Sequence, residues 1–377
     1  MKLYEYEAKG ILAKYGIPVP KGELVTTTKQ ACDTASKLKL PVALKSQVLV
    51  AGRGKAGGIL FANSPADVEK SAEKLLNMSI KGIPVRSLWI EEKIQIKKEL
   101  YFGITIDRFN KNYVAIASAV GGVEIEEVAA KSPGSVTKLL IKPELGFRSF
   151  HARQMARKMG YTGNQLLMLE RIFGSLYLAG MDYDAELIEM NPLVETSEGM
   201  FAAADARIIV DDNALFRHKE YKDRAAEGEF TSEEIEATKN DLAYVKLDGN
   251  IGVIGNGAGL VMATLDTIQL YGGKPANFLD VGGGATSDRI ATALKIVLSD
   301  PNVKVLFINI LGGITRCDEV AKGILEAKEK ANVTKPMVIR LVGTNEEEGK
   351  HILTEAGIYV LESMEEAAHK VIEIRDK

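Results

Sequence analysis

Cysteine is scarce in this chain, and the scarcity excludes one class of protein. Cys32 and Cys317 are the two cysteines among 377 residues, and they lie far apart in the sequence. A small secreted scaffold held together by disulfides needs several cysteines at close spacing, so that class is excluded. A reducing compartment fits this composition.

Long apolar runs and a strong charge bias are also lacking. No run approaches the roughly 20 apolar residues that a membrane-spanning helix requires. The N-terminal segment mixes charged and apolar residues, so it resembles neither a secretory signal nor an Arg- and Ser-rich transit peptide. A formal net charge of −3 gives no reason to expect nucleic acid or a membrane as a partner. We therefore expect a cytoplasmic protein.

The composition that remains is that of a soluble multidomain protein. Hydrophobic residues make up 46% of the chain and charged residues 26%, which is ordinary for a globular protein. A chain of 377 residues exceeds one typical core, so two or three domains are expected.

Helix and strand patterns mix irregularly in the first part of the chain. The amphipathic stretch 6–15 predicts a helix that ends at Gly16 and Pro18. Four runs rich in β-branched and aromatic residues predict strands. They are VALKSQV, SLWIEEKI, ELYFGITID and YVAIASAV.

The segment 217–241 is almost wholly charged or polar, and it favours a solvated helical linker over a binding tail. The predicted organisation is a first domain over 1–230, a linker over 231–249 and a second domain over 250–377.

The pattern changes after Asn250, where apolar strands alternate with helical segments. Five runs predict the strands: IGVIGNGAG, ANFLDVGGGAT, VKVLFINILGGIT, PMVIRLVGTN and IYVLES. Such alternation implies right-handed βαβ units and a parallel sheet with helices on both faces. A flavodoxin-like or Rossmann-like domain follows, with ligands expected at the carboxyl ends of its strands.

A glycine-rich segment, KSQVLVAGRGKAGG, begins at Lys45. Glycines let backbone amides approach phosphate oxygens, and Arg53 and Lys55 could add positive charge. Lys45 lies inside an apolar strand, where a lysine must extend to solvent or meet an anion. A phosphate-binding loop and an ordinary hairpin turn are about equally favoured by the composition.

The segment 182–207 predicts a cluster of oxygen ligands. Glu189 and Asn191 lie two residues apart on a predicted strand and share a face. A turn near 197–199 would return Asp205 on the partner strand. A carboxylate and an amide oxygen suit Mg²⁺, which takes its remaining ligands from water and phosphates. Metal binding is favoured over a half-exposed polar hairpin.

The chain resembles the β subunits of succinyl-CoA synthetases (succinate–CoA ligases) along essentially its whole length. The segments that carry the resemblance are long and occur in the same order. They are LYEYEAKGILAKYGIPVPKG, KSQVLVAGRGKAGG, KKELYFGITIDR, GGVEIEEVA, IEMNPLV, NALFR, YVKLDGNIGVIGNGAGL, GGKPANFLDVGGGAT and NILGGITRCD.

The resemblance implies an N-terminal ATP-grasp fold followed by a flavodoxin-like parallel-sheet domain. It also implies a reaction that interconverts succinate, CoA and ATP (or GTP) with succinyl-CoA, ADP (or GDP) and phosphate, through a phosphohistidine. Mg²⁺ would accompany the nucleotide.

Site residues can be carried over by position. The resemblance implies that Lys45, Gly52, Arg53, Gly54, Glu91 and Glu99 contact the nucleotide, with Glu91 at the hinge between lobes and Glu99 near the ribose. It implies that Asn191 and Asp205 bind Mg²⁺, and that Glu189 orients the phosphohistidine. It assigns Asn256, Gly313, Ile314 and Thr315 to the succinate and phosphate site.

A helix is predicted to begin near Arg316–Asp318, directly after GGIT. Its free amides and partial positive charge would suit a phosphate or carboxylate. Thr315 departs from the valine expected there and leaves the acid specificity open. Cys317 beside this turn is interpreted as a packed thiol rather than a nucleophile.

The reaction needs a histidine, and none of the four in this chain lies in a glycine-rich loop. His151, His218, His351 and His369 are interpreted as surface or capping residues. The resemblance implies that a separate α subunit supplies the reactive histidine and the CoA site, in an αβ or α2β2 complex.

Two alternatives stay open at this stage. One is the β subunit of a related ligase such as malate–CoA ligase, and the other is a non-enzymatic nucleotide-binding module. The intact set Glu189, Asn191 and Asp205 argues against the second. Pro20 favours adenine over guanine only weakly.

Overall fold

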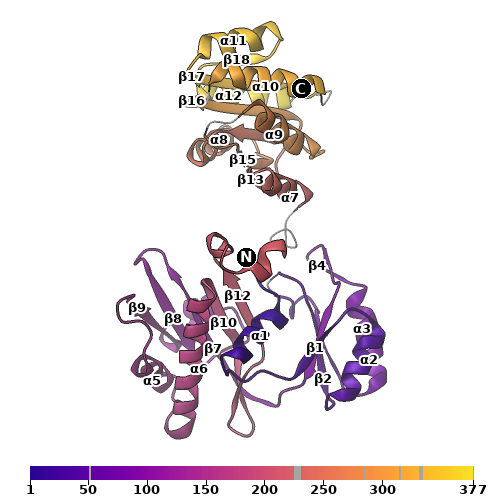
Figure 1. Ribbon diagram of the computed structural model, residues 1–377, viewed down its shortest axis with the longest axis vertical. Coiled ribbons are helices and arrows are strands. Elements are labelled where there is room, and N and C mark those ends of the chain that lie inside the picture. Colours follow the sequence, from indigo (N-terminus) through magenta and orange to yellow (C-terminus); the bar gives the residue numbers. More distant parts are fainter. Residues whose placement is uncertain (51, 225–230, 284–285, 314–315, 331–333, 377) are drawn as a thin grey trace. The chain divides into compact units, whose positions relative to one another are not determined.

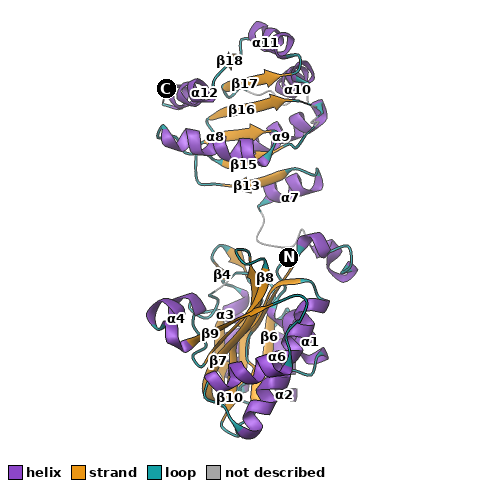
Figure 2. Cartoon of the chain, turned by 90° about the vertical axis from the view of Figure 1, so that its left-hand side faces the viewer, coloured by secondary structure: helices purple, strands orange, loops and turns teal. Residues whose placement is uncertain are grey.

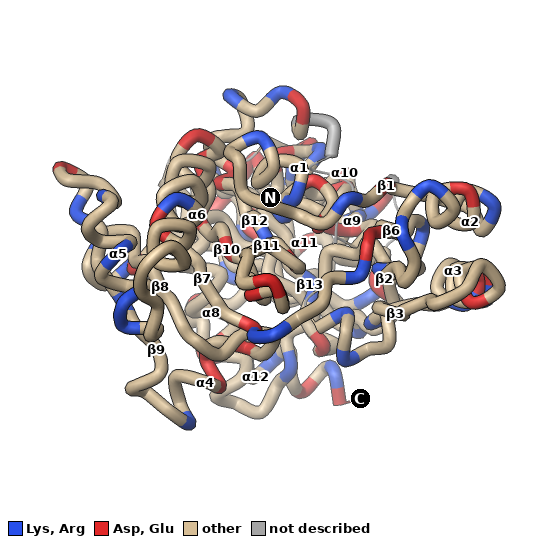
Figure 3. Tube along the Cα trace, turned by 90° about the horizontal axis from the view of Figure 1, so that it is seen from below, with Lys and Arg blue, Asp and Glu red and all other residues tan. Residues whose placement is uncertain are grey.

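The computed structural model describes residues 1–50, 52–224, 231–283, 286–313, 316–330 and 334–376 (Figure 1). The chain divides into two compact units, Met1–Glu229 and Phe230–Lys377. Within the described residues, no helix is long and apolar enough to cross a membrane. Basic and acidic residues are interspersed along the chain rather than sorted by sign (Figure 3).

The first unit begins with helix α1 (Glu5–Lys14), which confirms the helix predicted over 6–15. A four-stranded sheet follows, in the order β1-β6-β2-β3. Its strands are β1 (Gly22–Val25), β2 (Val42–Ser46), β3 (Ile59–Ala62) and β6 (Leu88–Glu92). A short hairpin of β4 (Ser79–Ile80) and β5 (Ile83–Pro84) lies outside this sheet.

Helices α2 (Thr28–Lys37) and α3 (Pro65–Leu76) lie side by side against this small sheet (Figure 1). The hydroxyls of Thr27 and Ser64 accept hydrogen bonds from backbone amides of the first turns and so cap the N-termini of the two helices. Apolar residues spaced along α3, Val68, Ala72 and Leu75, are fully buried against the sheet.

A second, antiparallel sheet has the order β11-β10-β7-β8-β9, with β12 also paired to β10. The strands are β7 (Ile96–Asp107), β8 (Asn112–Ser118), β9 (Val136–Ile141), β10 (Ala185–Thr196), β11 (Phe201–Ala203) and β12 (Ala206–Val210). The helices of this part are α4 (Ile125–Lys131), α5 (Ser149–Lys158) and α6 (Gly163–Asp182), with short 3₁₀ turns at Pro133–Ser135, Asp212–Ala214 and Lys219–Arg224.

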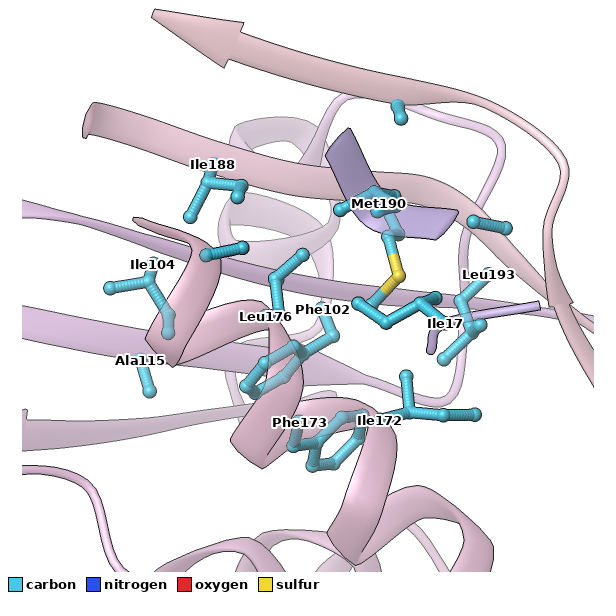
Figure 4. Packing of buried hydrophobic residues seen from close by; sticks show 14 of the residues in the cluster. Ile17, Phe102, Ile104, Ala115, Ile172, Phe173, Leu176, Ile188, Met190 and Leu193 are labelled. Atoms are coloured by element: carbon cyan, nitrogen blue, oxygen red, sulfur yellow. The ribbon is translucent and has the colours of Figure 1, made fainter. Parts of the chain in front are cut away.

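Helix α6 covers the second sheet and supplies much of its core. Phe173 stacks on Phe102 of β7, with ring centroids 3.7 Å apart, and Leu176 and Ile188 are buried nearby (Figure 4). The four strand runs predicted in this part of the chain are confirmed as β2, β6, β7 and β8.

The second unit is a six-stranded sheet in the order β13-β15-β14-β16-β17-β18 (Figure 2). The parallel strands are β14 (Ile251–Gly255), β15 (Asn277–Asp280), β16 (Val305–Gly312), β17 (Met337–Gly343) and β18 (Tyr359–Leu361). In chain order these five lie 2-1-3-4-5, which is the flavodoxin-like arrangement. The five predicted strands are confirmed.

Helices cover both faces of this sheet because successive strand residues point to opposite sides. Helices α9 (Ser287–Ser299) and α10 (Cys317–Lys330) share one core with Ile254 and Ile308. Helices α8 (Ala258–Leu270) and α12 (Met364–Arg375) share the other with Val253 and Phe307. Helix α11 (Glu346–Glu355) precedes β18.

The residues expected to form a linker over 231–249 differ from that expectation. They form α7 (Ser232–Lys239) and β13 (Ala243–Lys246), and β13 pairs antiparallel with β15. The segment is mostly polar, but its apolar residues Ala237, Leu242 and Tyr244 are buried in the core of the second unit.

Candidate functional site

The first unit contains a cavity of about 320 Å³ where four parts of the chain meet. They are the N-terminal segment, the glycine-rich turn after β2, the β7–β8 region, and β10 with the bend before β12. Seven predicted site residues line it: Gly52, Arg53, Gly54, Glu99, Glu189, Asn191 and Asp205.

Lys45 lies inside β2 and pairs with carboxylates rather than extending to solvent. Its side chain is 8% exposed, and its ammonium group lies 2.9 Å from Glu5 and 2.8 Å from Glu91. It also donates a hydrogen bond to the carbonyl of Ala204 at 2.6 Å. Burial by itself would lower the pKa of Lys45, but the two carboxylates more than offset this and hold it above its usual value.

Arg53 lies in the turn that follows β2 and faces two carboxylates. Its Nη2 lies 2.7 Å from Glu5 and 3.2 Å from both oxygens of Asp205. Its Nη1 donates to the carbonyl of Ser46 at 3.0 Å. Gly52, at the start of the turn, has a φ of +79°, a conformation that other residues rarely adopt.

Glu189 points into the cavity from β10 beneath a tyrosine. The Tyr101 hydroxyl donates to it at 2.7 Å, and Arg207 lies 3.9 Å away. Burial raises the pKa of Glu189, although the hydrogen bond from Tyr101 opposes that effect. The same burial, together with the Glu189 charge, raises the pKa of Tyr101.

Asn191 and Asp205 are held next to each other by the backbone, since the Asn191 amide donates to the Asp205 carbonyl at 3.3 Å. Asp205 lies in the bend between β11 and β12, not on the partner strand that the sequence predicted. The Asn191 side chain accepts from the amide of Gly122 at 2.9 Å and donates to the carbonyl of Val123 at 3.0 Å.

The side-chain oxygens of Asn191 and Asp205 fit a hard cation that takes most of its ligands elsewhere. Among the described residues there is no group of three or more His, Cys, Asp or Glu that could hold a metal. A dedicated protein cage is therefore not offered there. Mg²⁺ bound through one or two protein oxygens, water and phosphates fits the donor chemistry.

Glu99 reaches the cavity from β7, and its carboxylate lies against the backbone of Gly122. A Cβ on Gly122 would lie 2.2 Å from a Glu99 carboxylate oxygen. Gly122 also has a φ of +72°, and this backbone conformation, rather than the contact with the movable Glu99 side chain, is what favours glycine here.

Glu91 does not line the cavity with the other predicted nucleotide contacts. It lies in β6, buried, where Lys9 and Lys45 pair with it and the Trp89 indole donates to it at 2.8 Å. Lys45 likewise lies behind the lining and is linked to the cavity through Glu5.

The second unit brings Asn256 and Gly313 to neighbouring strand ends. Asn256 follows β14, and its side chain exchanges two hydrogen bonds with the backbone of Leu311, at 2.9 and 2.8 Å. Gly313 directly follows β16. Ile314 and Thr315 lie outside the described residues, so their predicted roles stay predictions.

Cys317 begins α10 and is fully buried, which confirms the packed thiol; burial also raises its pKa. His151 accepts a hydrogen bond from the backbone amide of Arg148 and caps the start of α5, as predicted. His351 and His369 are exposed, also as predicted. The interpretation of His218 as a surface or capping residue was wrong.

His218 is buried because it stacks on Tyr183, with 8° between the rings, and lies 2.8 Å from Asp184. None of the four histidines is among the described residues that line the cavity.

Comparison with known proteins accounts for both units. The ATP-grasp domain family matches residues 2–195, and the CoA-ligase family matches residues 254–374. The chain is 51% identical over 374 residues to the succinate–CoA ligase [ADP-forming] subunit beta of Ignicoccus hospitalis, covering 99% of each.

This chain belongs to the succinate–CoA ligase β-subunit family. It is also 49% identical over 373 residues to the [GDP-forming] subunit beta of Thermus thermophilus, covering 99% of this chain and 98% of that one. Both nucleotide types therefore occur among its relatives.

A solved structure supports the same fold across both units. The ATP citrate lyase of Methanothrix soehngenii, in complex with citrate and coenzyme A, matches with a TM-score of 0.76 and covers 99% of each chain. At 19% identity this similarity concerns the fold alone.

Sequence reasoning missed two charged residues beside the site, Glu5 and Lys9 of α1. Both lie on the same helical stripe as the buried residues Ala8 and Leu12. That placement was the available signal, since a charge on the apolar stripe of an amphipathic helix requires a buried partner. Tyr101 and Arg207, which flank Glu189, carried no comparable signal.

Proposed function

We propose that this chain is the nucleotide-binding subunit of a succinate–CoA ligase. It would interconvert succinate, CoA and ATP (or GTP) with succinyl-CoA, ADP (or GDP) and phosphate, through a phosphohistidine on an α subunit. The observation that carries the proposal is a cavity lined by Arg53, Asn191 and Asp205, with Lys45 directly behind the lining, in a chain 51% identical to a subunit of that name.

Lys45 and Arg53 are the proposed phosphate contacts, together with the backbone of Gly52 and Gly54. Their carboxylate partners hold both side chains charged and in place, which suits a polyphosphate arriving from solvent. Glu99 is proposed to contact the ribose, and Glu91 to act through Lys45.

Asn191 and Asp205 would hold Mg²⁺. The metal, when bound, would neutralise charge on the phosphates. Arg53 Nη2 lies 3.2 Å from both Asp205 oxygens, which keeps this carboxylate in place against the glycine-rich turn.

Glu189 is the proposed catalytic residue, orienting the partner's phosphohistidine near the nucleotide. Tyr101 fixes its carboxylate, and the raised pKa strengthens its capacity to accept a hydrogen bond from an imidazole. Asn256, Gly313, Ile314 and Thr315 are proposed for succinate and phosphate.

A partner's histidine is supported by the described cavity lining, which contains none, and by the name of the relatives, which are β subunits. We propose an α subunit that supplies the reactive histidine and the CoA site, in an αβ or α2β2 complex.

The test is reconstitution of this chain with its α subunit and ATP labelled on the γ-phosphate. We expect Mg²⁺-dependent labelling of a histidine on the α subunit, followed by succinyl-CoA formation. Nucleotide binding without transfer would instead favour a binding module. Turnover of malate but not succinate would assign a related ligase.

Glu189→Ala tests the catalytic assignment within that system. We expect single-turnover labelling of the α subunit to slow much more than nucleotide binding weakens, because the carboxylate acts on the imidazole. Labelling at the rate of the unchanged chain would remove Glu189 from this role.

A further inference from the structure

A buried chain of ion pairs runs from the interior of the first unit to the cavity. Positive and negative side chains alternate along it, from Lys9 on α1 to Asp205 in the bend between β11 and β12. Its members, called the ion-pair chain below, are Lys9, Glu5, Glu91, Lys45, Arg53 and Asp205.

Glu5 is the centre of the ion-pair chain. Its carboxylate lies 2.7 Å from Lys9, 2.9 Å from Lys45 and 2.7 Å from Arg53. Its side chain is 1% exposed, yet part of the residue lines the cavity. One carboxylate therefore joins both proposed phosphate contacts to a single point on α1.

Lys9 lies behind this point and has no place in the described cavity lining. Its side chain is 1% exposed, and its ammonium group pairs with Glu5 and with Glu91. Any influence of Lys9 on a bound nucleotide must pass through those two carboxylates.

We propose that Glu5 and Lys9 are positioning residues for nucleotide binding. Glu5 fixes the side chain of Arg53 in the cavity lining and that of Lys45 directly behind it, and Lys9 neutralises the carboxylate charge that this requires. The inference rests on the proposed function of the cavity.

Fixing these cations matters because both are long and flexible side chains. Lysine and arginine lose rotamer freedom when they bind a phosphate, and a site that has already restricted them binds more tightly. Without Glu5, Arg53 would keep a single carboxylate partner among the described residues, Asp205, which is also the proposed Mg²⁺ ligand.

Variants that restore the charge balance can distinguish a positioning role of Glu5 and Lys9 from a role in stability alone. The ion-pair chain has three cations and three carboxylates. Lys9→Met leaves an unpaired negative charge and Glu5→Gln an unpaired positive one, so each alone should lower the unfolding temperature. The double variant K9M/E5Q is neutral again.

The experiment measures thermal unfolding and the Kd of Mg·ADP and Mg·ATP on the full chain, by calorimetry. We expect K9M/E5Q to recover most of the unfolding temperature lost by either single variant. Its nucleotide Kd should still rise by about tenfold, the typical effect of losing charge-assisted hydrogen bonds. In the complex with the α subunit, the KM values for succinate and CoA should not change.

Glu195→Gln is the matched control. Glu195 is another buried carboxylate of the first unit, held by Lys97 at 2.7 Å and Tyr161 at 2.8 Å, outside the described cavity lining. This variant should lower the unfolding temperature without changing the nucleotide Kd.

Glu5→Asp keeps the charge balance and withdraws the carboxylate by one methylene, so it tests the idea even if the double variant fails to fold. We expect the nucleotide Kd to rise, with a smaller loss of unfolding temperature than in Glu5→Gln, because the negative charge is kept. An unchanged nucleotide Kd in Glu5→Asp or in K9M/E5Q would overturn the positioning role but not the proposed function. Absence of nucleotide binding by the unmodified chain would overturn the proposed function as well.

Discussion

At the scale of single residues, the site is defined by which charges are buried with a partner. Lys45, Arg53 and Glu5 are nearly inaccessible to solvent and neutralise one another. Isolated charges in such positions would cost several kcal/mol, so each is present because the others are. The lysine in an apolar strand was visible in the sequence, but its partners on α1 and β6 come from distant segments.

Asp205→Ala should weaken the use of Mg²⁺ by the reconstituted enzyme. It removes a charged oxygen ligand, and we expect the Mg²⁺ concentration for half-maximal rate to rise by at least about tenfold. Asp205→Asn, which keeps one oxygen but no charge, should give an intermediate value. An unchanged Mg²⁺ dependence would exclude Asp205 as a ligand.

Glu189→Gln should stabilise the chain at neutral pH. Burial raises the pKa of Glu189, so the stability it contributes is complete below its unfolded pKa of about 4.3 and is lost as pH rises through the folded pKa. Glutamine carries no charge, and its amide oxygen can still accept a hydrogen bond from the Tyr101 hydroxyl. Thermal unfolding should therefore show a higher midpoint for the variant at pH 7 and no difference below pH 4; equal midpoints throughout would refute the burial argument.

At the scale of elements, the site depends on how α6 and the long strands β7 and β10 pack. The 3.7 Å stack of Phe102 on Phe173 fixes β7 from its core side, while Glu99 and Tyr101 extend from the same strand toward the cavity region. Alternation of side chains along a strand makes this division possible.

Phe173→Ala tests that support. Removal of a buried aromatic ring should lower the free energy of unfolding by about 3–5 kcal/mol. Chemical denaturation measures the loss. Phe109→Ala is the control, because Phe109 is 93% exposed and should change stability by less than about 0.5 kcal/mol. Similar losses in both variants would contradict the packing described.

At the scale of the whole chain, two units with separate cores share one polypeptide. The proposed nucleotide contacts belong to Met1–Glu229, and the proposed acid and phosphate contacts to Phe230–Lys377. A nucleotide should accordingly stabilise the first unit and leave the second nearly unchanged.

Calorimetry of the full chain with and without Mg·ADP tests this division. At a ligand concentration 100 times the Kd, the first unit should gain about 2.7 kcal/mol and unfold at a higher temperature. The transition of the second unit should keep its midpoint, which serves as the internal control. A common shift of both transitions would mean that the units unfold together.

Local patterns in the sequence determined much of the fold and of the family. Periodicity and turn residues act over a few positions and predict individual elements. They predicted the five strands after Asn250, the helix over 6–15 and the strands around Lys45 and Glu189. The glycine-rich turn and the segment IEMNPLV likewise carried their chemistry within short stretches.

Only the tertiary structure decided which charges share one buried place. Glu5, Glu91 and Asp205 are separated by 86 and 114 positions in the chain numbering, yet Lys45 and Arg53 join them. The 231–249 segment was misread for the same reason, since β13 gains its partner β15 only in the folded sheet. Pairing of ions and strands depends on contacts between distant segments, and no local pattern contains them.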